Sequence, residues 1–193
     1  MTVSLTKGQK VSLAKEGGIT RIFMGLGWDV VAKKKGLFGL LGGGGQDIDL
    51  DASCLVFDEA GTLVDQIWFR QLAGMNGAIV HTGDNRTGAG DGDDEVIRVD
   101  LSKLPSAVKS LIFTVNSFLG QTFDMIANAG CRVVDEVSGK ELAIFSLSES
   151  GPHTGLVLAK IYRHGGEWKI HAIGEKTNGR TFHDMMPVIQ AAL

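Results

Sequence analysis

The chain has 193 residues, a formal net charge of −3 and only two cysteines, and 44% of its residues are hydrophobic. This length suits one domain, spanning residues 1–193, that buries a sizeable core without disulfides. The sequence has no basic stripe with interleaved aromatic residues and no long apolar run near its start, which argues against nucleic-acid binding, secretion and membrane insertion and favours a cytoplasmic protein.

Short apolar or alternating segments separated by turn residues predict strands along most of the chain. The segments do not alternate with helical patterns, so we expect an all-β fold, a β-sandwich of mostly antiparallel strands. Cys54 and Cys131 fall on the apolar faces of their segments, and we expect both to be buried. The predicted strands are 19–28, 47–53 with its continuation 55–58, 62–69, 78–82, 96–101, 111–116, 127–134, 141–147, 155–162 and 168–173.

Two helical segments are expected. One is a single turn at 102–108 around Pro105. The other is a short helix near the C-terminus, with Thr181 as its cap and Asp184 in its first turn. Pro187 would either kink that helix or mark its start.

The segment 33–45 has neither helical nor strand periodicity, and we expect an inserted loop. Three lysines, at 33 to 35, precede four large apolar residues and a run of four glycines. The apolar residues either fold back onto the domain or contact a partner or membrane surface through 33–41.

Asp47, Asp49 and Asp51 alternate with apolar residues in a predicted strand, which places their carboxylates on one face. Neighbours on that face lie ~7 Å apart and repel by about 2 kcal/mol at an effective dielectric near 20. This repulsion indicates a bound cation. Asp29, at the end of strand 19–28, would lie near the same site if the strand points that way; otherwise it is a turn residue.

The loop 83–95 combines glycines with five acidic residues. Hard oxygen ligands on a flexible loop favour calcium over magnesium, zinc or copper, although a solvated acidic turn is the alternative. If the strand and the loop meet, their carboxylates suffice for two calcium ions. The expected ligands are Asp29, Asp47, Asp49, Asp51, Asp84, Asn85, Thr87, Gly88, Gly90, Asp91, Asp93, Asp94 and Glu95.

The run from His81 to Glu95, with Gly25-Leu-Gly-Trp-Asp29 and Asp49-Leu-Asp-Ala-Ser53 before it, resembles the TerD family of tellurium-resistance and stress proteins. The segments 67–70, 113–118 and 33–39 make the chain most similar to the TerZ branch. The resemblance covers nearly the whole chain. It implies a calcium-binding β-sandwich that acts in a cytoplasmic stress system.

We therefore expect a non-enzymatic module in which one or two calcium ions join strand 47–53 to loop 83–95. Its expected partners are proteins of a tellurite or stress-response system, among them a membrane-associated component at the inner face of the membrane. Two alternatives remain open. One is a calcium-dependent surface binder of phospholipid or carbohydrate, and the other is a hydrolase that uses the acidic cluster.

Overall fold

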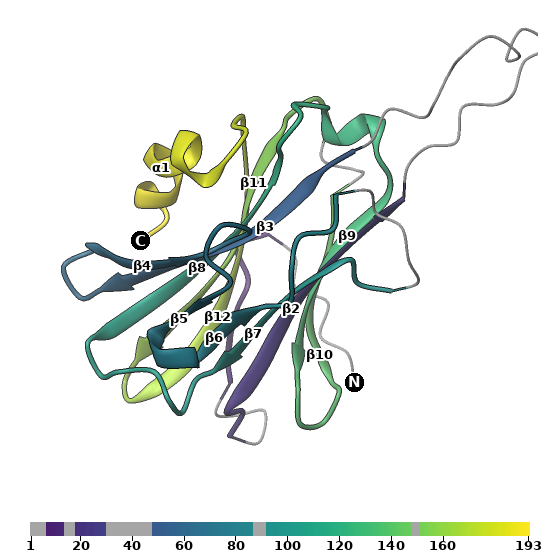
Figure 1. The fold of residues 1–193 in the computed structure, drawn as a ribbon. Helices are drawn as coiled ribbons and strands as arrows, with labels where there is room; N and C mark the ends of the chain where they lie inside the picture. Colours follow the sequence, from purple (N-terminus) through teal and green to yellow (C-terminus); the bar gives the residue numbers. More distant parts are fainter. Residues whose placement is uncertain (1–6, 14–17, 30–47, 87–91, 148–150) are drawn as a thin grey trace, which may run out of the picture.

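Two antiparallel sheets face each other in the computed structural model, which describes residues 7–13, 18–29, 48–86, 92–147 and 151–193 (Figure 1). The first sheet has the order β1-β12-β11-β8-β3-β4, and the second has the order β10-β9-β2-β7-β6-β5. The predicted β-sandwich is therefore confirmed. The segment 33–45 lies outside the described residues.

The strands of the first sheet are β1 (Lys10–Ser12), β3 (Leu50–Asp58), β4 (Leu63–Ile67), β8 (Val108–Ser117), β11 (Gly155–His164) and β12 (Glu167–Thr177). Those of the second are β2 (Arg21–Asp29), β5 (Ala73–Gly74), β6 (Ile79–His81), β7 (Glu95–Asp100), β9 (Ala127–Asp135) and β10 (Glu141–Ser146). Short 3₁₀ helices form at Met75–Gly77 and Phe123–Met125.

The alternation along β3 separates two apolar layers. Residues such as Leu50, Cys54 and Val56 point into the core between the sheets, where Cys131 is also buried. Leu55 and Phe57 point to the outer face of the first sheet. Asp49 and Asp51 share the periodicity of that outer face. The strand that carries them is thus buried on both sides over most of its length.

A single described α-helix, α1 (Phe182–Ala191), covers the outer face of the first sheet (Figure 1). Its Phe182, Met185 and Ile189 belong to the same buried cluster as Leu55 and Phe57. Thr181 precedes the helix as predicted, and the Asp184 carboxylate accepts the backbone N–H of Thr181 at 3.2 Å. Among the described residues, no helix is long and apolar enough to cross a membrane.

Two details differ from the sequence-based expectation. The helix begins five residues before Pro187, so this proline lies inside it and does not mark its start. The segment 102–108 forms hydrogen-bonded turns instead of a helical turn. Pro105 has no N–H to donate, and the Asp100 carboxylate accepts the Ser102 N–H, so local side-chain bonds replace helical ones there.

Candidate metal centre

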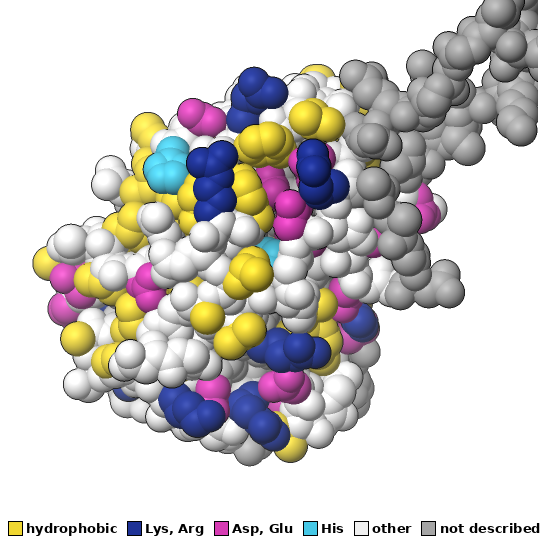
Figure 2. All heavy atoms as spheres, viewed as in Figure 1, with side chains coloured by type: hydrophobic (Ala, Val, Ile, Leu, Met, Phe, Trp, Pro, Cys, Tyr) yellow, Lys and Arg dark blue, Asp and Glu magenta, His cyan; other side chains and the backbone are white. Residues whose placement is uncertain are grey.

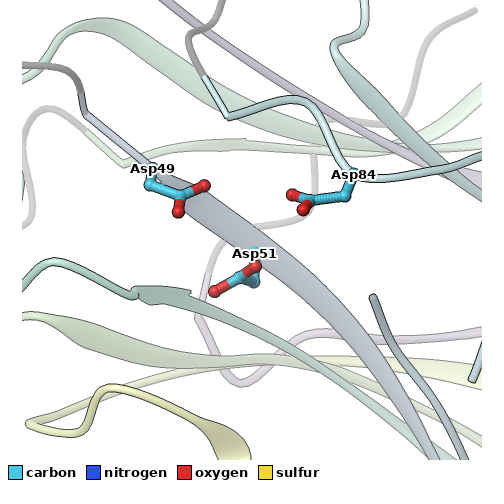
Figure 3. Close-up of side chains that lie close together, drawn as sticks. All are labelled: Asp49, Asp51 and Asp84. Carbon is cyan, nitrogen blue, oxygen red and sulfur yellow. The ribbon is translucent and has the colours of Figure 1, made fainter. Parts of the chain in front are cut away.

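Three carboxylates meet where β3 begins. Asp49 immediately precedes β3, and Asp51 is two residues further on, so both side chains leave the same face of the strand. Asp84 reaches them from the loop that follows β6. One oxygen from each carboxylate lies within 4.8 Å of the other two, and Figure 3 shows Asp49 and Asp84 turned toward each other. We call these three residues the acidic triad.

The two strand members of the triad are buried. Asp49 is 6% exposed and Asp51 is 3% exposed, whereas Asp84 is exposed. The Asp49 Oδ1 atom is buried and accepts no hydrogen bond from the residues that the structure describes. Such an unpaired buried carboxylate oxygen costs free energy, and a bound cation would remove that cost.

Asn116 supports the triad from β8, where it lies opposite Asp51 in the strand register. Its Nδ2 donates to Asp51 Oδ2 at 2.9 Å and to the backbone oxygen of Arg180 at 2.7 Å. The remaining Asn116 Oδ1 is buried, and no donor within the described segments reaches it. The amide therefore orients Asp51 and leaves an additional neutral oxygen unpaired.

Burial and mutual repulsion oppose ionisation of the strand carboxylates. Burial, with repulsion from Asp84 as the next cause, raises the pKa of Asp49 to about 6. Burial, with repulsion from Glu95 and Asp49, raises the pKa of Asp51 to about 8. Without a cation, Asp51 therefore resists deprotonation at neutral pH, and Asp49 does so only in mildly acidic solution.

Glu95, at the start of β7, connects the two parts of the centre. Its Oε2 accepts the backbone N–H of Ala52 at 2.8 Å, and its Oε1 accepts that of Asn85 at 3.3 Å. The side chain is fully buried, and its Oε2 lies 3.4 Å from His81 Nε2. Because the Gly83 N–H donates to His81 Nδ1, the ring proton belongs on Nε2, which faces Glu95. Glu95 thus fastens the Asp84 loop to β3.

A second acidic group lies in a separate pocket of about 430 Å³. Asp29, Asp93 and Asp94 line this pocket together with Asn128 and Arg132. All three carboxylates already accept hydrogen bonds within the protein. Asn128 donates to Asp29 at 2.8 Å, and the Trp28 N–H donates to Asp94 at 2.9 Å. Burial, followed by repulsion from Asp29 and Asp93, raises the pKa of Asp94, while the hydrogen bond from Trp28 opposes that shift.

Asp93 is held by Arg132. Arg132 Nη2 lies 2.9 Å from Asp93 Oδ2, and Arg132 Nε donates to Asp93 Oδ1 at 3.0 Å. Gly25 lies opposite Arg132 in the β2–β9 register, and a Cβ at this position would collide with the Asp93 carboxylate. A glycine at 25 therefore leaves room for Asp93 to reach its cationic partner.

The chain was compared with known proteins and solved structures. A family model described as the TerD domain matches residues 1–186. The chain belongs to the TerD family. It is 54% identical to the tellurium resistance protein TerZ of Serratia marcescens, covering 99% of this chain and 98% of that protein. It is also 43% identical to the stress response protein SCP2 of Bacillus subtilis (strain 168), covering 96% and 98% of the two chains.

The fold of this TerD-family chain matches a solved structure. A homologue of the telluride resistance protein TerD from Streptomyces coelicolor A3(2) superposes with a TM-score of 0.71 at 21% identity. The match covers 84% of this chain and 92% of that one. The resemblance to the TerD family and its TerZ branch is thus confirmed, and the solved homologue shares the fold.

The structure divides the predicted ligands of this TerD-family chain into four groups. Asp49, Asp51 and Asp84 form the triad, so the predicted meeting of strand and loop occurs. Asp29, Asp93 and Asp94 line the separate pocket. Asn85 and Glu95 act as braces, because Asn85 Nδ2 donates to Asp94 Oδ1 at 2.8 Å. Outside the described residues lie Asp47, Thr87, Gly88, Gly90 and Asp91.

Sequence reasoning missed Asn116 as a member of the centre. A signal was present, because Asn116 interrupts the strongly apolar run that forms β8, and a polar side chain in such a strand is buried only when it has partners. The identity of its partner, Asp51, depends on the register between β3 and β8.

Proposed function

We propose that this chain is a calcium-binding, non-enzymatic module of a tellurite-resistance and stress response. The observation that carries the proposal is the buried, unpaired Oδ1 of Asp49 beside the carboxylates of Asp51 and Asp84. Three oxygen ligands with negative charge suit a hard divalent cation. The names of the relatives, a tellurium resistance protein and a stress response protein, support the cellular role.

The spacing of the triad suits calcium. Two oxygens that each lie 2.3–2.6 Å from one calcium ion can be separated by at most about 5 Å. The triad oxygens lie within 4.8 Å of one another, so a point at their centre is at most about 2.8 Å from each, and a shift of a few tenths of an ångström by the exposed Asp84 brings all three into contact with one ion. The Oδ1 of Asn116 is an additional candidate ligand, since it is buried beside Asp51 without a donor.

The number of converging carboxylates favours ion binding over hydrolysis. A glycosidase uses two carboxyl groups that flank the bond to be cleaved, about 5–9.5 Å apart. The triad instead brings one oxygen from each of three carboxylates within 4.8 Å of one another. A convergent group of three carboxylates therefore supports a cation ligand set better than an acid–base pair.

Calorimetric titration of chelator-stripped protein with calcium and magnesium tests the proposal. We expect calcium to bind more tightly than magnesium. Asp49→Asn should weaken calcium binding by tenfold or more, because it removes a buried charged ligand. Glu59→Gln is the matched control, since Glu59 is an exposed acid on the β3–β4 turn that pairs with Lys109. Wild-type calcium affinity in the Asp49→Asn variant would contradict the proposal.

The stoichiometry of the same titration distinguishes one ion from two. The described residues contain one triad of the kind that holds an ion, which accounts for one equivalent. A second equivalent would be assigned to Asp29 and Asp94 in the separate pocket. Loss of that equivalent in Asp94→Asn, with the first retained, would confirm the assignment.

We also propose that other proteins of the stress system bind the chain, with a membrane-associated component contacting 33–41. The motivation is the combination of three lysines and four large apolar residues in this segment. Deletion of residues 36–43 should leave calcium affinity unchanged and reduce recovery of the protein with membranes at low salt. Equal recovery of the two forms would exclude this contact.

A further inference from the structure

A small pocket beside the acidic triad combines acidic, basic and aromatic side chains. It has a volume of about 200 Å³ and is lined by Asp49, Asp51, Phe69, Asp84, Arg86 and Phe118. The unpaired Asp49 Oδ1 belongs to a residue that lines this pocket and is 6% exposed. The pocket is therefore where an ion held by the triad would meet solvent.

Two aromatic rings form one wall of the pocket. Phe69 and Phe118 pack edge to face with their ring centroids 5.6 Å apart, and both are half-buried. Leu119 follows Phe118 and is 46% exposed. An apolar wall beside an ion site can contact the organic part of a ligand whose charged group reaches the ion.

Three exposed arginines lie beside this aromatic wall. Arg86 lines the pocket itself. The Arg70 guanidinium lies 5.2 Å from the centroid of Phe69, and Arg180 Nε donates to the backbone oxygen of Phe118 at 2.9 Å. Within the described part of the chain, none of the three forms an ion pair with a carboxylate. On the face seen in Figure 2, basic side chains lie on both sides of an acidic group, with hydrophobic side chains between them.

The charges around the pocket predict which ligands it attracts. Without a cation, an incoming anion meets the triad carboxylates directly. A bound divalent cation requires all three carboxylates to be deprotonated, and the ion together with the three arginines then leaves two positive charges in excess. A phosphate ester carries about −1.5 to −2 charge at neutral pH and pairs well with guanidinium groups, so it matches this excess better than a single carboxylate does.

We infer that the calcium-loaded pocket binds a phosphate group, with one phosphate oxygen on the ion and others on Arg70, Arg86 and Arg180. This inference rests on the proposed calcium site. In monodentate binding, three carboxylates fill three of the six to eight positions that calcium uses, so the triad leaves positions for a ligand oxygen. Phe69 and Phe118 contact the group that the phosphate is attached to. Phosphate binding therefore requires the ion, whereas ion binding does not require phosphate.

The experiment titrates the calcium-loaded and the chelator-treated protein with inorganic phosphate and with phenyl phosphate, at calcium concentrations that keep both in solution. We expect both probes to bind only in the presence of calcium, with phenyl phosphate binding more tightly because its ring reaches Phe69 and Phe118. The Arg70→Gln/Arg86→Gln variant should lose tenfold or more in phosphate affinity, because each lost charge-assisted hydrogen bond is worth roughly a factor of ten. Its calcium affinity should be equal or higher, since two repelling charges are removed.

Arg21→Gln is the matched control, because Arg21 is an exposed arginine at the opposite end of β2 from Asp29. It should bind both calcium and phosphate as wild type does. Sedimentation with phosphatidylcholine vesicles, with and without phosphatidic acid, separates a lipid source of the phosphate from a free one. If the protein binds the phosphatidic acid vesicles only with calcium, and the double arginine variant does not bind them, the phosphate group belongs to a lipid.

The outcomes distinguish the two proposals. If calcium binds and neither phosphate probe nor the phosphatidic acid vesicles bind, the phosphate inference is wrong and the calcium site stands. If phosphate binds equally well without calcium, or equally well to the double arginine variant, the inference is also wrong. If calcium itself does not bind, both proposals fail.

Discussion

The carboxylate of Glu95 accepts the backbone N–H of Ala52 at 2.8 Å across the gap between the two sheets. Strand β4 pairs with β3 only from Cys54 onward, so the Ala52 N–H would otherwise face an unpaired edge. The same carboxylate accepts the N–H of Asn85, next to Asp84. This one side chain therefore sets the distance between the strand and the loop of the acidic triad.

We expect Glu95→Ala to destabilise the protein and to weaken calcium binding. The substitution leaves the Ala52 N–H buried without an acceptor, which costs about 1–3 kcal/mol, and it releases the Asp84 loop. Glu95→Gln keeps an amide oxygen for Ala52 and should retain most of the stability. Chemical denaturation measures the first effect, and calcium titration measures the second. Equal stability of the alanine variant and wild type would show that Glu95 is not a brace.

Calcium should raise the melting temperature of chelator-stripped protein. The folded state alone brings the triad together, so a ligand at a hundredfold excess over its Kd stabilises it by roughly 2.7 kcal/mol. Differential scanning calorimetry with and without calcium measures this shift, and magnesium at the same concentration should produce a smaller one. An identical melting temperature with and without calcium would contradict the assigned site.

Asp51→Asn should have opposite effects in the two states of the protein. Without calcium the variant should be more stable than wild type, because burial and repulsion from Glu95 disfavour the charged Asp51. The new side chain can still accept from Asn116 through its amide oxygen. With calcium the variant should be the less stable of the two, since it has lost a charged ligand. Melting curves check this: the variant should have the higher melting temperature with chelator, and wild type should have the higher melting temperature with calcium.

The stability of metal-free protein should depend on pH through the same two carboxylates. Their folded pKa values, about 6 for Asp49 and about 8 for Asp51, lie above the unfolded value of 3.8. Between these limits the folded state binds more protons than the unfolded state, so their contribution to stability decreases as pH rises from about 4 to 8. Calcium binding requires the deprotonated forms and should strengthen over the same range.

Comparison with Asp51→Asn isolates this effect. Burial lowers the pKa of His153 and of His171, so both histidines contribute in the opposite direction, with stability gained as pH rises through their unfolded value. The difference in unfolding free energy between wild type and Asp51→Asn removes their contribution. Wild type should become less stable relative to Asp51→Asn as pH rises from 5 to 8. A difference that stays constant would show that Asp51 does not titrate there.

Asp93→Asn tests whether the acidic loop acts as one site. Because Asp93 pairs with Arg132 and lines the separate pocket, its substitution should leave calcium binding to the triad within about twofold of wild type. It should lower stability by about 1 kcal/mol or less, since Arg132 is partly exposed and retains Glu141 as a partner. Calcium titration measures the affinity, and urea denaturation of the same preparation measures the free energy of unfolding. A tenfold loss of calcium affinity would place Asp93 in the ion site.

Local periodicity alone determined much of this molecule. Side chains alternate across a strand, so the spacing of Asp49 and Asp51 predicts a shared face and the spacing of Leu50, Cys54 and Val56 predicts the opposite one. Turn residues between short apolar runs predict the sandwich for the same reason. These features depend on neighbours in the chain, and the sequence contains all of that information.

The choice of partners among the carboxylates depended on the tertiary structure. Asp84, Asp93 and Glu95 belong to one acidic loop, yet one completes the triad, one pairs with Arg132 and one braces β3. Which of them meets a given strand is set by sheet order and register, because β2 lies between β7 and β9 and brings Arg132 within reach of Asp93. Contacts between residues far apart in the chain arise only when the two sheets pack, and no local pattern encodes that packing.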